Sequence, residues 1–504
     1  MSDDEGAYTR LQRVGIVLGP LSFLFVQFGV SPASLSPAAN AVLACTLWIA
    51  VWWMTEAVPI PVTSLLPILL FPALGVTSVT DAAAPYADPV VFLFLGGFLV
   101  ALAIERWGLH RRIALNVLLR AGEDARRLIF GFMLATAFLS MWVSNTATAM
   151  MMVPIGMAVV AQRQAFRAPD DATPRYSVST LDALEAGETT LRQSNFGVAL
   201  MLGIAYGASI GGVATLIGTP PNAILAGIAS SSLGVEIGFV EWMLFGVPTA
   251  LVFLPVAWLA LITVFPPDTS AVSAGRSVVR EQMAALGPMS TGERRVVVVF
   301  GVVVFGWLLR PFVIEPVAPA ITDTTIALIG GVLVFLVPVD LRRGEFLLDW
   351  EATTRVPWGV LLLFGAGFSL ARAFQSSGLD RWIAGGLSGL QGVDLVWVLL
   401  AVAALVVFLT EVTSNSATAS LFIPVMVSLG ASLAAPSLVL MVTVAVAASM
   451  AFMLPVATPP NAIVFGSGYL SIPKMVRVGI WLNLLGILFV TAMAYLWLPF
   501  VWGI

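Results

Sequence analysis

The chain has very few of the side chains that build disulfides, metal clusters or acid–base dyads. Cys45 is its only cysteine and His110 its only histidine. The single cysteine excludes an intrachain disulfide and a cysteine metal cluster, and the single histidine argues against a histidine-based metal site. Charged residues make up only 10% of the 504 residues. An enzyme embedded in a membrane would need a catalytic dyad or a metal cluster there, and the sequence offers neither. We therefore predict that the protein is not an enzyme.

Apolar residues dominate instead. Hydrophobic side chains make up 59% of the chain, and its mean hydropathy is +0.98, which is typical of a polytopic helical membrane protein. The apolar runs are continuous rather than alternating with a period of two, so an outer-membrane barrel is excluded. A polar, acidic segment at 1–13 precedes an apolar run at 14–30. We expect this run to be a retained first span, since no convincing cleavage site follows it.

Eleven apolar segments are predicted to cross the membrane. They lie near 14–30, 40–56, 61–75, 90–105, 196–231, 242–265, 296–312, 321–338, 356–374, 436–470 and 477–500. Segments 196–231 and 436–470 are too long for one straight span, and a Thr-Pro-Pro-Asn motif interrupts each, so we predict broken helices. Two further stretches, 127–160 and 395–428, each join two short apolar helices at a Ser-Asn motif. We predict that both are re-entrant hairpins.

Both polar motifs occur twice. Ser-Asn-Thr at 144–146 recurs as Ser-Asn-Ser at 414–416. Each copy is followed by the hexapeptide Thr-Pro-Pro-Asn-Ala-Ile, which starts at Thr219 and again at Thr458. The two hexapeptides lie closer together than the two Ser-Asn tips do, so the first half carries an insertion between its motifs, and the polar segment 161–195 supplies it. Duplicated helix-breaking motifs in apolar sequence indicate a transporter built from internal repeats.

The placement of positive charge predicts the topology. With the N-terminus in the cytoplasm and eleven crossings, 21 of the 24 Lys and Arg residues fall on the inner side of a cell membrane (plasma or inner), as the positive-inside rule requires. The C-terminus is then outside. Five crossings separate the equivalent helices 90–105 and 356–374, and an odd number inverts the second repeat. The first hairpin therefore opens inward and the second outward.

We expect four regions along the chain. They are N-terminal scaffold helices at 1–126, the first hairpin and broken helix of a transport domain at 127–265, further scaffold helices at 266–393, and the second hairpin and broken helix at 394–504.

The two motifs offer both anion-binding and cation-binding groups. A break in a helix within lipid leaves backbone N–H and C=O groups that cost several kcal/mol each unless they are paired. The helix that restarts presents its positive end, which favours an anion by about 0.3–2 kcal/mol. The helix that ends presents carbonyl oxygens, which suit Na⁺, and Ser, Thr and Asn side chains can serve either ion. No Arg or Lys lies in these motifs.

The paired Ser-Asn tips, the paired Thr-Pro-Pro-Asn breaks and their order resemble the divalent anion/sodium symporter (DASS) family, over nearly the whole chain. Members carry dicarboxylates, citrate or sulfate. The resemblance implies an all-α polytopic membrane protein with eleven transmembrane helices and two re-entrant hairpins in two inverted repeats. It also implies an elevator-type mechanism and a homodimer in the lipid bilayer, with Na⁺ as the co-transported ion and no nucleic-acid partner.

The resemblance also assigns residues. Those implied to bind substrate are Ser144, Asn145, Thr146, Thr219, Ser414, Asn415, Ser416, Thr458 and Pro459. Those implied for one sodium site are Ser140, Ser144, Asn145 and Gly218, and those for the other are Thr410, Thr413, Asn415 and Ala457, the last through its carbonyl. Ser416 departs from the threonine that is common in carboxylate carriers of this family.

We expect Na⁺-coupled symport of a C4-dicarboxylate such as succinate, malate or fumarate. The alternatives are a sulfate or citrate symporter, a dicarboxylate exchanger of the same fold, and a channel. Glu411 lies beside a proposed sodium ligand, and a role in function and a hydrogen bond to the hairpin backbone both remain open. The glycines at 96–97 and at 365 and 367 favour close helix packing over nucleotide binding. The Arg-rich stretch 106–127 is predicted to be an amphipathic helix at the inner surface.

Overall fold

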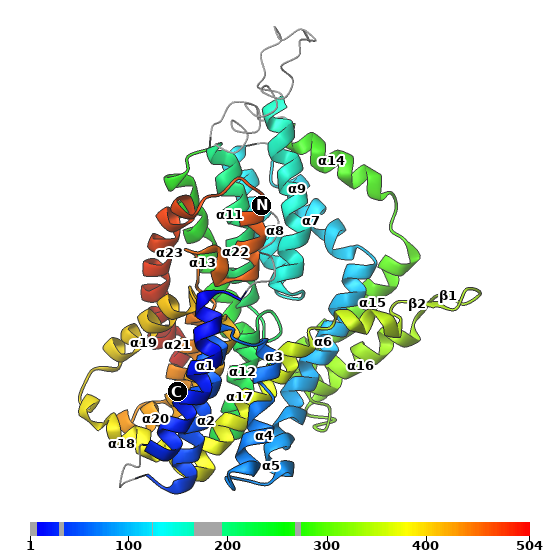
Figure 1. The fold of residues 1–504 in the computed structure, drawn as a ribbon. Coiled ribbons are helices and arrows are strands. Elements are labelled where there is room, and N and C mark those ends of the chain that lie inside the picture. Colours follow the sequence, from blue (N-terminus) through cyan, green and yellow to red (C-terminus); the bar gives the residue numbers. More distant parts are fainter. Residues whose placement is uncertain (1–7, 30–34, 123, 166–193, 268–273, 504) are drawn as a thin grey trace.

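The computed structural model is built almost entirely from α-helices and describes residues 8–29, 35–122, 124–165, 194–267 and 274–503 (Figure 1). The first elements are α1 (Arg10–Leu24), η1 (Phe25–Gly29), α2 (Pro37–Thr55), α3 (Ile60–Thr63), α4 (Leu66–Ala73), α5 (Val79–Ala83), η2 (Ala84–Ala87), α6 (Pro89–Arg106), α7 (Leu109–Arg120), α8 (Ala125–Ser140) and α9 (Asn145–Ala165). The middle elements are α11 (Asn195–Gly212), α12 (Pro220–Leu233), α13 (Phe239–Val264), α14 (Ala274–Leu286), α15 (Thr291–Leu309), η3 (Arg310–Ile314) and α16 (Asp323–Leu336). The last are β1 (Pro338–Asp340), β2 (Glu345–Phe346), η4 (Trp350–Arg355), α17 (Trp358–Ser377), α18 (Leu379–Gly386), η5 (Ser388–Leu390), α19 (Leu395–Thr410), α20 (Asn415–Leu433), α21 (Ser437–Ala447), η6 (Pro455–Ala457), α22 (Pro459–Gly466), α23 (Ile472–Ala492), η7 (Met493–Trp497) and α24 (Leu498–Trp502).

Nine helical segments in the described part of the chain are long and apolar enough to cross a membrane. Four shorter apolar segments of 10–17 residues accompany them. Between them they overlap every one of the eleven predicted spans, so the chain is a multi-pass helical membrane protein. One of the nine is α20, which is half of the second predicted hairpin, so length alone does not separate hairpin helices from crossing helices.

The predicted interruptions are confirmed. Helix α8 ends at Ser140 and α9 begins at Asn145, while α19 ends at Thr410 and α20 begins at Asn415. The first long apolar segment is interrupted at 213–219 between α11 and α12, and the second at 448–458 between α21 and α22, a stretch that includes η6. Each restart has two prolines in its first turn, where the missing N–H groups would have no helical partner in any case.

The centre of the molecule is α11. Every residue from Phe196 to Gly212 is buried, and α11 packs on α8, α9, α13 and α22. Glycines allow the close approach: a Cβ on Gly211 would lie only 2.2 Å from the carbonyl oxygen of Ala137 on α8. By contrast α15 exposes large apolar side chains such as Phe305, as a helix that faces lipid does. The most buried helix therefore packs against both helices that flank the first Ser-Asn motif, α8 and α9, and against α22, which begins at the second Thr-Pro-Pro-Asn motif.

The packing role predicted for the paired glycines is also confirmed. A Cβ on Gly96 would lie 2.4 Å from the carbonyl oxygen of Ala327, where α6 crosses α16. A Cβ on Gly365 would lie 2.2 Å from the ring of Tyr86. These positions accept glycine because neighbouring helices meet there.

The all-α prediction needs one correction. Strands β1 and β2 form a small antiparallel hairpin in which Pro338 pairs with Phe346 and Asp340 with Glu345. Gly344 has a φ of +65°, a conformation that glycine adopts without strain and that the tight turn requires. The sequence prediction placed this stretch in a loop because the strands are too short to show a periodic pattern.

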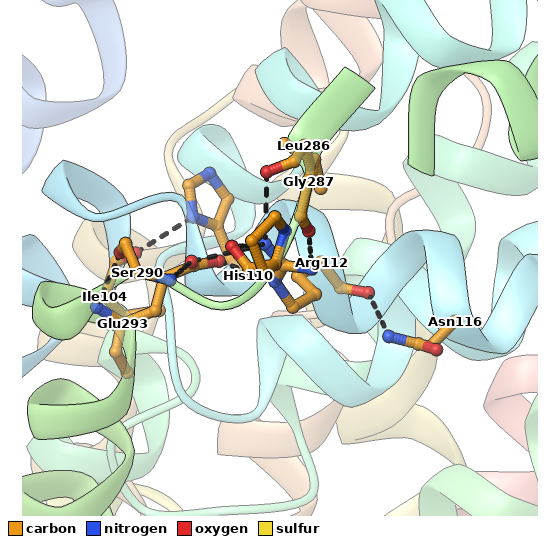
Figure 2. A network of polar contacts seen from close by, with 9 residues as sticks. Ile104, His110, Arg112, Asn116, Leu286, Gly287, Ser290 and Glu293 are labelled. Carbon is orange, nitrogen blue, oxygen red and sulfur yellow. Dashed lines mark hydrogen bonds and ion pairs between the residues drawn. The ribbon is translucent and has the colours of Figure 1, made fainter. Parts of the chain in front are cut away.

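A network of polar contacts fixes α7 against the α14–α15 connection (Figure 2). The guanidinium of Arg112 donates to Glu293 Oε1 at 2.7 Å and to the Gly287 carbonyl at 3.0 Å. Glu293 also accepts the Ser290 amide at 2.7 Å and so caps α15. The helix predicted in the Arg-rich stretch is thus present as α7. Most of the polar insertion predicted at 161–195, namely 166–193, lies outside the described residues.

Figure 1 shows how the two halves are placed. Helices α9, α11 and α14 lie toward one end of the molecule, and α18 and α20 lie toward the opposite end. Helix α22 of the second half packs on α11 of the first, so the two halves interleave.

Candidate functional site

Four helices begin at the same cavity, which has a volume of about 810 Å³. They are α9, α12, α20 and α22, the restarting helices of the two Ser-Asn and the two Thr-Pro-Pro-Asn motifs. All nine residues predicted to bind substrate line this cavity: Ser144, Asn145, Thr146, Thr219, Ser414, Asn415, Ser416, Thr458 and Pro459. Because a helix N-terminus has unpaired N–H groups and a partial positive charge, four of them around one cavity favour an anion.

In the first half, oxygen atoms gather around the carboxamide of Asn145. One end of this group lies 2.5 Å from Ser140 Oγ and 3.2 Å from the carbonyl oxygens of Gly218 and Ala208. Ser144 keeps its hydroxyl at the start of α9, where it accepts the Ala147 amide at 3.2 Å. The groups come from the end of one helix, the start of the next and both sides of a later break. The break in α11–α12 brings them together.

The second half repeats the arrangement at the equivalent positions of the repeat. The hydroxyl of Thr410 lies 2.7 Å from Asn415 Oδ1 and 3.1 Å from the Ala448 carbonyl oxygen. Thr410 and Asn415 occupy the positions of Ser140 and Asn145. Each half therefore places a hydroxyl, a carboxamide and a backbone carbonyl from its broken helix within contact of one another.

Three of the predicted sodium ligands do not line the cavity. Ser140 and Thr410 are fully buried behind it, next to the two asparagines. Thr413 is 7% exposed, and its hydroxyl is shared with Thr418 at 2.7 Å and with the Leu409 carbonyl at 2.9 Å. The other five, Ser144, Asn145, Gly218, Asn415 and Ala457, line the cavity.

One asparagine side chain in each half donates hydrogen bonds to backbone carbonyls at the helix break. Asn222 Nδ2 donates to the carbonyls of Gly212 and Thr215 at 3.2 and 2.8 Å. Asn461 Nδ2 makes the corresponding bonds to Ala451 and Leu454 at 3.3 and 3.0 Å. Both side chains are fully buried, so they replace the helical donors that the break removes. We did not predict this role, although the repeat of the asparagine within the hexapeptide was a visible signal.

A buried carboxylate accepts backbone amides in the second helix break, and the first break has no equivalent carboxylate. Glu411 is 3% exposed and accepts three consecutive amides, those of Phe452, Met453 and Leu454, at 2.7–2.9 Å. The amide of Asn483 donates to the same carboxylate at 2.7 Å. The position that corresponds to Glu411 in the first repeat is Met141, which directly follows Ser140 as Glu411 follows Thr410. The sequence left open a hydrogen bond to the hairpin backbone, but the bonds that Glu411 makes reach the second break at 452–454 instead.

The rest of the cavity wall combines apolar and charged groups. Phe94, Phe98, Met150 and Ile217 supply apolar surface from α6, α9 and the first break. Charged side chains also line the cavity, at Glu56, Glu105 and Arg355. None of these seven was predicted, because their sequence neighbourhoods give no sign of the cavity that the fold creates.

Comparison with known proteins gives matches along the whole chain. The family described as the sodium:sulfate symporter transmembrane region matches residues 14–503. The sodium-dependent dicarboxylate transporter SdcS of Staphylococcus saprophyticus is 42% identical over 503 residues, which cover 99% of this chain and 93% of that protein. The protein of the same description from Staphylococcus aureus is 40% identical over 497 residues, covering 98% and 92% respectively.

A solved structure shares the fold. The YdaH transporter of Alcanivorax borkumensis superposes with a TM-score of 0.53 and covers 86% of this chain and 88% of that one. Its sequence identity is 16%, so the likeness concerns the fold alone.

Proposed function

Because the chain belongs to the sodium:sulfate symporter family, we propose that it is a sodium-coupled symporter of small dianions, with C4-dicarboxylates as its substrates. The family match and the full-length relatives confirm the resemblance inferred from the paired motifs. The named relatives are transporters rather than enzymes, as the sparse reactive side chains predict.

The observation that carries the proposal is the pair of matched oxygen clusters beside the cavity. Na⁺ is a hard cation that binds hydroxyl, carboxamide and carbonyl oxygens, and these are the groups around Asn145 and around Asn415. The first cluster has Ser140, Ser144, Asn145 and Gly218 as its proposed ligands. The second has Thr410, Thr413, Asn415 and the Ala457 carbonyl, with Thr413 as the least direct member because its hydroxyl is already shared.

A dicarboxylate fits a cavity with two anion-receiving ends. Each Ser-Asn tip begins a helix, α9 or α20, and offers first-turn N–H groups with hydroxyl and amide side chains. A dicarboxylate presents one carboxylate to each end. Sulfate would leave one set of donors unpaired, and unpaired buried donors cost about 1–3 kcal/mol each. Citrate would bring a third carboxylate toward motifs that contain no positive side chain.

The proposed mechanism is alternating access of the elevator type. The two hairpins and the two broken helices (127–265 and 394–504) form the transport domain, and the helices of 1–126 and 266–393 form the scaffold of a homodimer. The hairpins α8–α9 and α19–α20 are re-entrant and open on opposite faces, with the N-terminus in the cytoplasm and the C-terminus outside. The placement of α9 and α20 toward opposite ends of the molecule supports this topology.

The test is uptake of labelled succinate into proteoliposomes that contain the purified protein, with and without an inward Na⁺ gradient. We expect accumulation only with the gradient, and equal uptake under both conditions would overturn the coupling. Uptake that requires unlabelled dicarboxylate inside and ignores Na⁺ would favour the exchanger.

Competition identifies the substrate. Succinate, fumarate and malate should each inhibit uptake of labelled succinate at concentrations well below those at which sulfate or citrate does. Ser416 lacks the methyl group of a threonine and so widens the cavity, which makes this comparison informative. Stronger competition by sulfate than by every dicarboxylate would reject the substrate and keep the fold.

A further inference from the structure

The cavity reaches the surface of the molecule at a charged mouth, defined by Glu56, Glu105 and Arg355. All three line the cavity, and Glu56 and Arg355 are exposed. Arg355 is the one cationic side chain among the described residues of the cavity wall. The segments that carry the three residues are those that the distribution of Lys and Arg places on the inner side.

The structure holds Arg355 at this mouth. Arg355 ends η4, whose cap is Asp349, with Asp349 Oδ1 accepting the Ala352 amide at 2.9 Å. Asp349 also pairs with Arg106 in the last turn of α6, one residue from Glu105. In the described part of the chain, Arg355 makes no hydrogen bond and no ion pair within 4.0 Å. Glu105 and Arg355 line the same cavity and lie on the two elements that the Arg106–Asp349 pair joins.

The charges at the mouth break the symmetry of the repeats. In the register that aligns Ser144 with Ser414, Arg355 corresponds to Pro85 and Glu105 to Gln375. Gln375 is neutral and donates to the Ser232 carbonyl at 3.1 Å. The equivalent positions of the inverted repeat are therefore neutral. Since the Ser-Asn tips themselves are matched in the two halves, the charges at Glu105 and Arg355 distinguish the two repeats.

We propose that Arg355 is a contact for the carboxylate of the dianion at the inner mouth, and that the Glu105 carboxylate on the same cavity wall opposes this contact by repelling the dianion. This inference rests on the proposed function. A dianion that leaves the neutral donors of the Ser-Asn tips meets Arg355 as its first full positive charge. Glu105 lines the same cavity, so its negative charge weakens this attraction and keeps the contact short-lived. The equivalent positions of the other repeat, Pro85 and Gln375, carry no charge.

The inference predicts opposite effects for the two charges, confined to one face. Uptake of labelled succinate at saturating Na⁺ is measured in everted vesicles, which expose the inner face, and in right-side-out vesicles. Arg355→Gln should raise the KM about fivefold in everted vesicles, as expected for one charge contact near water. Glu105→Gln should lower the KM there, because it removes a negative charge that repels the dianion. Both variants should stay within about twofold of the wild type in right-side-out vesicles.

Matched controls separate the contact from a structural role. Arg343→Gln and Glu351→Gln remove one positive and one negative charge between α16 and α17, the connection that also carries Arg355. Both residues are exposed and do not line the cavity, so both variants should match the wild type. Arg355→Lys should restore most of the lost affinity. With 1 M choline chloride on both sides, where the Debye length is about 3 Å, the effect of Arg355→Gln should shrink.

Two kinds of failure are distinguishable. Absence of Na⁺-driven succinate uptake by the wild type would overturn the proposed function and this inference with it. Normal wild-type uptake would overturn this inference alone under any of three results. These are equal effects of Arg355→Gln on both faces, no effect on either face, and a shift of the same sign for Glu105→Gln and Arg355→Gln.

Discussion

At the residue scale, one asparagine in each half is the side chain that we propose to contact both ions. Asn145 and Asn415 each line the cavity at the start of a restarting helix, and each contacts a buried hydroxyl on the preceding helix. A carboxamide can offer oxygen to a cation and N–H to an anion, so each asparagine is suited to contact both ions. An alanine there removes both functions and leaves the backbone free to form the same helices.

Asn145→Ala and Asn415→Ala should each abolish Na⁺-driven uptake of labelled succinate, since each loses a side chain that we propose to serve both ion and substrate. The measurement is uptake in proteoliposomes at matched protein content. Asn116→Ala, on α7 and away from the cavity, is the control and should transport normally. Full Na⁺-driven uptake by either variant would refute the site assignment.

The single histidine gives a prediction about pH. Burial and the neighbouring charge of Arg111 lower the pKa of His110 below its ordinary value, although a hydrogen bond to the Ile104 carbonyl opposes the shift (Figure 2). The folded protein therefore binds a proton at His110 less readily than the unfolded chain does. Stability from this residue is present above the ordinary histidine pKa of about 6.5 and is lost as pH falls below it.

The melting temperature in detergent should accordingly fall between pH 7.5 and pH 5.5, and His110→Gln should reduce this fall. Glutamine keeps a polar group of similar reach and does not titrate. A fall of equal size in the variant and the wild type would show that other groups cause it.

At the scale of elements, the two broken helices are stabilised differently. The first interruption covers 213–219 and the second covers 448–458, so the second leaves more backbone groups without helical partners. Asn222 and Asn461 serve both breaks in the same way. The longer break also needs the Glu411 carboxylate, which pairs with three amides that point into the protein.

Glu411→Ala should lower the melting temperature clearly, because it leaves the Met453, Leu454 and Asn483 amides without their acceptor, at about 1–3 kcal/mol for each buried donor that stays unpaired. The Phe452 amide would keep Asn483 Oδ1 as an acceptor at 3.2 Å. Glu411→Gln retains one acceptor oxygen and should lose less. Glu281→Ala removes an exposed carboxylate from α14 and should melt like the wild type. Equal melting temperatures for Glu411→Ala and the wild type would show that water replaces the carboxylate.

At the scale of the whole molecule, the inverted topology makes a labelling prediction. With the buried Cys45 replaced by serine, a cysteine at the exposed residue Gln391 should react with a membrane-impermeant maleimide from outside. Cysteines at Glu281 on α14 and at Ala168, which lies outside the described residues, should react only from the cytoplasmic face. Labelling of Gln391 and Glu281 from the same face would refute the inversion.

The sequence by itself determined the elements and the motifs that define the site. Long apolar runs are favoured inside a membrane. Helix-breaking prolines leave backbone N–H and C=O groups there that are costly unless they find hydrogen-bond partners. Both signals are local, so the breaks at Thr219 and Thr458 and the tips at Asn145 and Asn415 were predicted within a few residues. The duplicated motifs predicted which positions of the two halves are equivalent. The resemblance to a family supplied the expected roles of individual residues.

Only the tertiary structure decided which distant groups meet. Ala208 reaches Asn145, Ala448 reaches Thr410, and Asn483 reaches Glu411 because helices far apart in the chain pack side by side. The mouth at Glu105 and Arg355 depends on α6 and η4 being tied together through Arg106 and Asp349. No local pattern encodes such contacts, since they arise from the packing of helices whose faces are almost uniformly apolar.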